Sequence, residues 1–190
     1  MSEKEILELT REAIRDGRFA EAASLATHLV DAGDPWNIAG YLYRATAYEN
    51  GGSAIDADLD KAISDYLRLS VLSPGRDTYL YLANALMSRG GDGFDRAYGY
   101  LKEAENYGPS PGLNLAYARY YEEARHPNIG LACKYFFSAA VAGRFLGFFG
   151  LSRGLRKTGR PALAFLVDIA RYLLGPFIAL LIGKKAQHRF

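Results

Sequence analysis

The fold is decided by the stretch Ala132-Cys-Lys-Tyr-Phe-Phe-Ser-Ala-Ala-Val-Ala-Gly143 and by its counterpart Ala97-Tyr-Gly-Tyr-Leu-Lys-Glu-Ala104, which continues to Gly108. Each stretch runs from a small residue to a glycine eleven positions later, which is about three turns of an α-helix. The alanine lets a neighbouring helix approach closely, and the glycine supplies the left-handed conformation that commonly ends a helix. The aromatic pair between them falls on the face that packs inward. Both stretches therefore predict helices of the same kind.

The same spacing recurs along the chain, which indicates internal repeats. The starting alanines are separated by 40, 35, 35 and 32 residues. No sustained period-two alternation and no run of β-branched residues in the sequence predicts a strand. The repeated segments are Ala22–Gly33, Ala62–Ser73, Ala97–Gly108, Ala132–Gly143 and Ala164–Gly175.

The segments between these stretches also have the pattern of helices, because each ends at a glycine or before a proline. They are predicted at about residues 3–15, 36–50, 78–89, 113–125 and 145–157. The sequence thus predicts an all-α protein, an α-solenoid of about five stacked antiparallel helix pairs. We expect a helical repeat domain over residues 1–175 and an apolar, basic C-terminal tail over residues 176–190.

Three segments of the sequence share a pattern of loop glycines, an acidic helix entry and an alanine- and aromatic-rich helix. They are the loop Tyr48-Glu-Asn-Gly-Gly-Ser-Ala-Ile-Asp-Ala-Asp-Leu-Asp-Lys-Ala-Ile63, the turn Gly90-Gly-Asp-Gly-Phe-Asp-Arg-Ala97 and the helix Ala132–Gly143. These segments resemble a known class of helical repeats, the tetratricopeptide class, and more closely its Sel-one-like subclass. The resemblance covers roughly residues 36–160, and the chain departs from the pattern in its irregular loop glycines and its apolar last repeat. The resemblance implies an adaptor or scaffold that binds other proteins and implies no reaction.

The charges of the chain are divided unevenly along its length. Residues 1–125 hold 13 Lys/Arg and 20 Asp/Glu, a net charge of −7, whereas residues 126–190 hold 10 Lys/Arg and the single acid Asp168, a net charge of +9. This division indicates that the two ends meet different surroundings. The alternative is a dipolar protein whose ends attract each other or a second copy.

No set of residues in the sequence predicts catalysis. His28, His126 and His188 have no metal-type ligand at helical spacing, and Cys133 is expected to be a structural thiol. Gly147, Gly150 and Gly154 recur on one helix face, which predicts close helix packing. Asp56, Asp58 and Asp60 are expected to charge a helix N-terminus. We therefore expect a non-enzymatic protein with no cofactor, no bound metal, no nucleic-acid partner and no small-molecule substrate.

Tyrosines on the predicted first helices indicate a partner-binding surface. First helices line the concave side of a stacked array, and Tyr and Arg are favoured at interfaces because they combine contact area with a polar tip. Most of these tyrosines could equally fill the core between repeats. The predicted partner-binding residues are Tyr41, Arg44, Tyr48, Tyr81, Asn84, Tyr117, Arg119 and Tyr120.

The C-terminal segment predicts a second docking site. Its uncharged part, residues 172–183, is too short to span a bilayer, and cations flank it on both sides. Such a segment favours an anionic membrane surface, a cap on the open end of the repeats, or a partner's groove. True insertion into a membrane is the remaining alternative for the longer stretch, residues 161–183. The charged N-terminus is not typical of a secretory signal, so we expect a cytoplasmic protein, with peripheral binding to the cytoplasmic face of a membrane as the alternative function. The predicted docking residues are Arg153, Arg156, Lys157, Phe177, Ile178, Leu181, Lys184 and Lys185.

Overall fold

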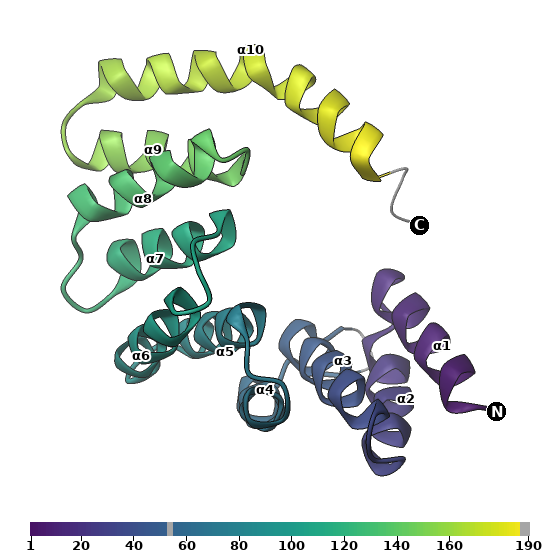
Figure 1. Ribbon diagram of the computed structural model, residues 1–190. Coiled ribbons are helices and arrows are strands. Elements are labelled where there is room, and N and C mark those ends of the chain that lie inside the picture. The colour runs from purple at the N-terminus through teal and green to yellow at the C-terminus, as the bar shows by residue number, and fades with distance from the viewer. Residues whose placement is uncertain (53–54, 187–190) are drawn as a thin grey trace. The chain divides into compact units, whose positions relative to one another are not determined.

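The computed structural model describes residues 1–52 and 55–186, and it describes the side chains of residues 1–52 and 55–173. Within these residues the chain forms helices throughout, and the only β-pairing is an isolated bridge between Gly52 and Ile55. The helices, labelled in Figure 1, are α1 (Glu3–Arg15), α2 (Phe19–Asp31), α3 (Trp36–Asn50), α4 (Leu59–Leu72), α5 (Arg76–Arg89), α6 (Gly93–Glu105), α7 (Pro111–Glu123), α8 (Ile129–Val141), α9 (Leu146–Lys157) and α10 (Pro161–Ala186).

The helices fall into two compact units. The N-terminal unit, Met1–Tyr107, contains α1 to α6, and the C-terminal unit, Gly108–Phe190, contains α7 to α10. Within each unit successive helices pack on each other. The units differ in charge, because the first holds 11 Lys/Arg and 18 Asp/Glu, a net −7, and the second holds 12 Lys/Arg and three acids, a net +9. The charge division predicted from the sequence therefore follows the division into units.

The helix ends follow local chemistry. The side chains of Ser2, Asp58, Ser110 and Asn128 each accept a backbone N–H bond at the start of a helix. Most of the glycines expected to end helices have positive φ, as the prediction required: Gly17, Gly33, Gly51, Gly90, Gly108, Gly143 and Gly159.

The helix end predicted at Gly175 is wrong. The backbone of α10 runs without a break from Pro161 to Ala186, and the helix bends part-way along its length (Figure 1). A proline inside a helix removes one backbone hydrogen bond and is accommodated by a bend, so Pro176 does not have to end the helix. The tail boundary expected at residue 176 therefore does not coincide with the end of a helix.

Small residues make the close helix crossings. Ala97 and Ala132 are 0% and 1% exposed, as the repeat spacing predicted. The packing face predicted for α9 is confirmed, because a Cβ on Gly147 would lie 2.5 Å from the backbone nitrogen of Ala140 in α8. A Cβ on Gly150 would overlap the ring of Phe136, also in α8. These glycines bring α8 and α9 together.

Candidate functional site

A row of tyrosines joins three helices of the N-terminal unit. Tyr81 of α5 stacks on Tyr66 of α4, with ring centroids 5.8 Å apart and planes at 20°. The buried Tyr66 donates a hydrogen bond from its hydroxyl to the Glu49 carboxylate of α3 at 2.9 Å. Tyr43 of α3 accepts a hydrogen bond on its hydroxyl oxygen from Nε of Arg11 in α1 at 2.9 Å. We name Tyr43, Tyr66 and Tyr81 the tyrosine row.

The outer members of the tyrosine row are accessible. Tyr81 is 42% exposed and Tyr43 is half-buried, while the side chain of Arg11 is 49% exposed. Burial raises the pKa of Tyr81, and the neighbouring Asp77 and Tyr43 raise it further. Burial also raises the pKa of Tyr66. The Tyr66 and Tyr81 hydroxyls therefore remain protonated near neutral pH and keep their capacity to donate hydrogen bonds.

Most of this arrangement could not be predicted from the sequence. Tyr81 was predicted as a binding residue, whereas Tyr43, Tyr66 and Arg11 were not. Arg11 and Tyr43 lie 32 positions apart, and no pattern in the sequence brings them together. The sequence placed Tyr43 on a predicted first helix. That position alone does not show whether the ring lies on the surface or in the core.

Arg44, predicted for the binding surface, connects helices instead. Its Nε and Nη2 donate to the two carboxylate oxygens of Asp65 in α4, each at 2.8 Å. The side chain of Arg44 is only 19% exposed, and its guanidinium lies 5.5 Å from the ring centre of Tyr41. The bidentate pair satisfies the buried carboxylate and holds α3 against α4. Arg44 is thus a positioning residue for Tyr41.

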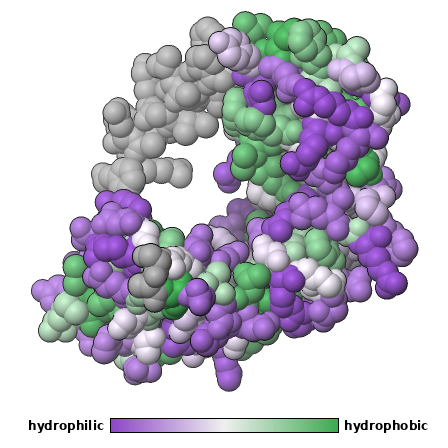
Figure 2. All heavy atoms as spheres, turned by 180° about the vertical axis from the view of Figure 1, so that it is seen from behind, coloured by the Kyte–Doolittle hydropathy of each residue, from purple (hydrophilic) through white to green (hydrophobic). Residues whose placement is uncertain are grey.

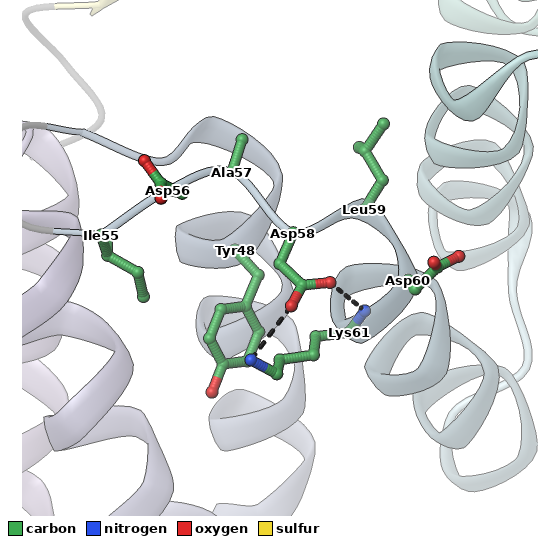
Figure 3. A pocket seen from close by; sticks show the side chains of 8 residues that line it. All are labelled: Tyr48, Ile55, Asp56, Ala57, Asp58, Leu59, Asp60 and Lys61. Carbon is green, nitrogen blue, oxygen red and sulfur yellow. Dashed lines mark hydrogen bonds and ion pairs between the residues drawn. The ribbon is translucent and has the colours of Figure 1, made fainter.

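Tyr48 lies beside a polar hollow of about 390 Å³ at the entry to α4, shown in Figure 3. Asp58 caps α4, because Oδ1 accepts the backbone N–H of Lys61 at 3.0 Å and Oδ2 pairs with Lys61 Nζ at 3.0 Å (Figure 3). The same Nζ lies 5.4 Å from the ring centre of Tyr48. The hydrogen bond from the Lys61 backbone lowers the pKa of Asp58. Asp58 therefore charges a helix N-terminus, as predicted for this acidic segment.

The remaining residues predicted for the binding surface lie in different environments. Asn84 of α5 is half-buried in the N-terminal unit. Tyr117 of α7 is 2% exposed and stacks on Tyr135 of α8, with centroids 5.1 Å apart, so it belongs to the core of the C-terminal unit. Tyr120 is half-buried, and Arg119 pairs with Glu123 at 3.0 Å. The eight predicted residues are therefore divided between the two units.

Three of the five cations predicted for docking form ion pairs inside the C-terminal unit. Glu122 of α7, whose side chain is 3% exposed, accepts bonds from Arg153 at 2.7 and 2.5 Å and from Lys157 at 2.9 Å. Arg156 pairs with Asp168 of α10 at 2.5 Å. Burial acts to raise the pKa of Glu122, but the bonds from Arg153 and Lys157 outweigh burial and leave this pKa lowered. These cations hold α7, α9 and α10 together, a role that the sequence pattern did not predict.

The first half of α10 exposes a hydrophobic face. Its buried residue Ala164 packs towards α9, and Arg171 lies 4.1 Å from the ring centre of Phe149 in α9. Figure 2 shows hydrophobic side chains gathered over the edge of the C-terminal unit. The large exposed apolar side chains of α10 are Leu163, Phe165, Leu166, Ile169, Tyr172 and Leu173.

The other predicted docking residues lie outside the described side chains. Phe177, Ile178, Leu181, Lys184 and Lys185 belong to the backbone of α10, and the structure does not describe their side chains. Within the described part of the chain, no helix combines the length and the apolar character needed to cross a membrane.

No metal site emerges from the described residues. In that part of the chain, no group of three or more His, Cys, Asp or Glu side chains is placed to hold a metal ion. The thiol of Cys133 is half-buried against Gly154, and burial raises its pKa, which leaves it protonated and weakly nucleophilic.

Comparison with known proteins finds similarity in the fold alone. No family model and no curated protein matches it. Among solved structures, it is similar to "MamA MSR-1 C2", with a TM-score of 0.62 and 14% identity over 92% of this chain and 97% of that chain. It is also similar to "Crystal structure of MamA protein", with a TM-score of 0.64 and 15% identity over 99% of this chain and 96% of that chain. The helix pairs and these neighbours confirm the predicted fold class, the all-α helical-repeat fold of the tetratricopeptide type.

Proposed function

We propose that this chain is a non-catalytic scaffold that binds a protein partner at the tyrosine row of its N-terminal unit. The observation that carries the proposal is the placement of Arg11, Tyr43 and Tyr81, which are partly exposed on α1, α3 and α5. These are the first helices of three successive pairs, so the row offers a continuous surface to an elongated ligand. Arginine and tyrosine are the residue types that most often dominate protein interfaces.

The row is held in place before any partner arrives. The ring of Tyr81 rests on Tyr66, and the hydroxyl of Tyr66 is anchored on Glu49. Arg11 is positioned by its bonds to Tyr43 and to Glu8. Because these side chains lose little freedom on binding, the entropic cost of forming a complex is reduced.

The charge around the row favours a partner segment that carries Lys or Arg. Asp77, beside Tyr81, has a side chain that is 73% exposed, and Glu8, beside Arg11, has one that is 61% exposed. The whole N-terminal unit has a net charge of −7. Complementary charge accelerates encounter and selects among partners.

The test is site-specific photo-crosslinking in the native host, with the crosslinking residue placed at position 81 or, as control, at position 107. Tyr107 belongs to the same unit and is 49% exposed, but it packs on Tyr79 outside the row. We expect one protein to crosslink at position 81 and not at position 107.

Purified partner then allows affinities to be compared. The double variant Tyr43→Ala/Tyr81→Ala is expected to bind at least about tenfold more weakly than the unmodified chain, because truncated hot-spot tyrosines cost more than about 1.4 kcal/mol. Tyr107→Ala should bind as the unmodified chain does. Equal losses in both variants, or turnover of a metabolite by the isolated protein, would refute the proposal.

A further inference from the structure

We propose that the outward face of α10 is a docking surface for an anionic phospholipid bilayer. This proposal goes beyond the protein-binding function, because it concerns the C-terminal unit and a different class of partner. We define the α10 face as Ala162, Phe165, Leu166, Ile169, Tyr172 and Leu173.

The α10 face has no charged side chain. At 100° per residue its members lie within about half of the helix circumference. Phe165, Leu166 and Leu173 are 63%, 59% and 62% exposed. The charged residues of this part of α10, Asp168 and Arg171, lie on the other side. Arg171 covers Phe149 of α9, and Asp168 pairs with Arg156. The face can therefore enter the acyl boundary of a bilayer without desolvating a charge.

The C-terminal unit carries the positive charge that an anionic surface would attract. The unit has 12 Lys/Arg residues and only three acids, and each acid already pairs with a cation of the same unit. Glu122 pairs with Arg153, Glu123 with Arg119, and Asp168 with Arg156. Because all three acids are already paired, none of them is left to neutralise the other cations of the unit, whose net charge is +9.

Cations stand at both ends of α10. Arg160 is exposed and directly precedes the helix, and Lys184 and Lys185 fall in its last turn. Between Arg171 and Lys184 the sequence has no charged residue. An apolar helix bracketed by Lys and Arg is the pattern of helices that lie in the plane of a membrane interface.

The length of α10 is also typical of such a helix. It has 26 residues, about 39 Å, whereas its packing partner α9 has 12 residues, about 18 Å. The second half of α10 therefore extends beyond the length that α9 can cover. A helix that lies flat on a bilayer can contact lipid along its whole length. A helix that only caps the repeats would need no more than the length that packs on α9.

The test uses flotation of the full chain with lipid vesicles. One preparation contains phosphatidylcholine alone, and the other contains about 30 mol% phosphatidylglycerol. We expect binding to the anionic vesicles that is at least about tenfold stronger than to the neutral ones, since each cation near the surface adds about fivefold. Binding should weaken between about 0.1 M and 1 M salt, where the screening length falls from about 10 Å to 3 Å.

Variants separate the apolar and the electrostatic contributions. Phe165→Ser/Ile169→Ser should lose at least about tenfold in vesicle affinity while keeping the helical circular dichroism spectrum. The matched control Val71→Ser/Leu72→Ser removes two exposed apolar side chains, 79% and 45% exposed, from α4 and should leave binding unchanged. Lys184→Gln/Lys185→Gln should weaken binding to anionic vesicles only. The Tyr43→Ala/Tyr81→Ala variant should bind vesicles normally, which keeps this test independent of the proposed protein partner.

Three results would overturn the proposal. The first is no binding of the folded full chain to anionic vesicles. The second is vesicle binding that does not respond to Phe165→Ser/Ile169→Ser. The third is a stable dimer, or a protein complex, that buries the α10 face and dissociates in this variant, because the face would then belong to a protein interface.

Discussion

At the scale of single residues, the fold depends on positions where a side chain would not fit. A Cβ on Gly147 would lie 2.6 Å from the backbone oxygen of Phe136 and 2.5 Å from the backbone nitrogen of Ala140. Backbone atoms cannot rotate out of the way, so the two helices would have to separate. The helical glycine Gly99 in α6, by contrast, has open space around it.

Gly147→Ala is expected to lower the free energy of unfolding by about 1–3 kcal/mol, because it overpacks the contact of α8 with α9. Gly99→Ala is the matched control, since the same substitution there meets nothing within 4 Å and replaces a poor helix former. It should raise stability by about 0.5–1 kcal/mol. Urea denaturation of both variants measures the difference, and equal shifts would contradict the packing role of Gly147.

Ala97→Leu and Ala132→Leu test the small residues that begin two of the repeats. Both alanines are buried, at 0% and 1% exposure, so the added side chain has no space to enter. We expect each variant to lose about 1–3 kcal/mol of stability. Unchanged denaturation midpoints for both would show that these helix crossings are not close.

At the scale of helices, ion pairs on buried carboxylates join separate helices. Arg44 and Asp65 join α3 to α4 in the N-terminal unit. Glu122 joins α7 to α9 through Arg153 and Lys157 in the C-terminal unit. Burial of the Glu122 carboxylate without a partner would be unfavourable, and the charges of Arg153 and Lys157 compensate this cost.

Stability of the C-terminal unit should depend on pH through Glu122. Its pKa is lowered in the folded chain, so its contribution is present above the unfolded value of about 4.3 and is lost as the pH falls through the folded value. Glu122→Gln should cost about 1–2 kcal/mol at neutral pH, at the lower end for charged hydrogen bonds because both cations are half exposed.

Urea titrations between about pH 6 and pH 3 provide the measurement. The unmodified chain should lose stability more steeply with acid than Glu122→Gln does. Parallel pH profiles would show that Glu122 titrates alike in the folded and unfolded chains.

At the scale of the whole molecule, the chain combines two compact units with opposite charge. The acidic unit presents the tyrosine row, and the basic unit presents the α10 face. The N-terminal unit has a core of its own, which includes Ala13, Ala22, Ala23 and Ala47 at the crossings of α1, α2 and α3.

A fragment of residues 1–107 is therefore expected to fold alone. It retains the six helices α1 to α6 and their contacts, so it should give a helical circular dichroism spectrum and a cooperative thermal transition. With a net charge of −7 it should bind an anion exchanger near neutral pH. A spectrum of unfolded chain would show that this unit needs residues 108–190.

The repeats, the helix pairs and most helix ends were determined by the sequence alone, because their causes are local. Helical periodicity, capping side chains and left-handed glycines such as Gly108 and Gly143 act within a few residues. The face of Gly147, Gly150 and Gly154 could be predicted for the same reason. The tertiary structure alone decided which distant side chains meet: Arg11 with Tyr43, and Arg153 with Glu122, lie 32 and 31 positions apart. It also decided that α10 continues past Pro176. The helix can accommodate the backbone hydrogen bond that this proline removes by bending, and local sequence rules do not determine whether a helix bends or ends at such a proline.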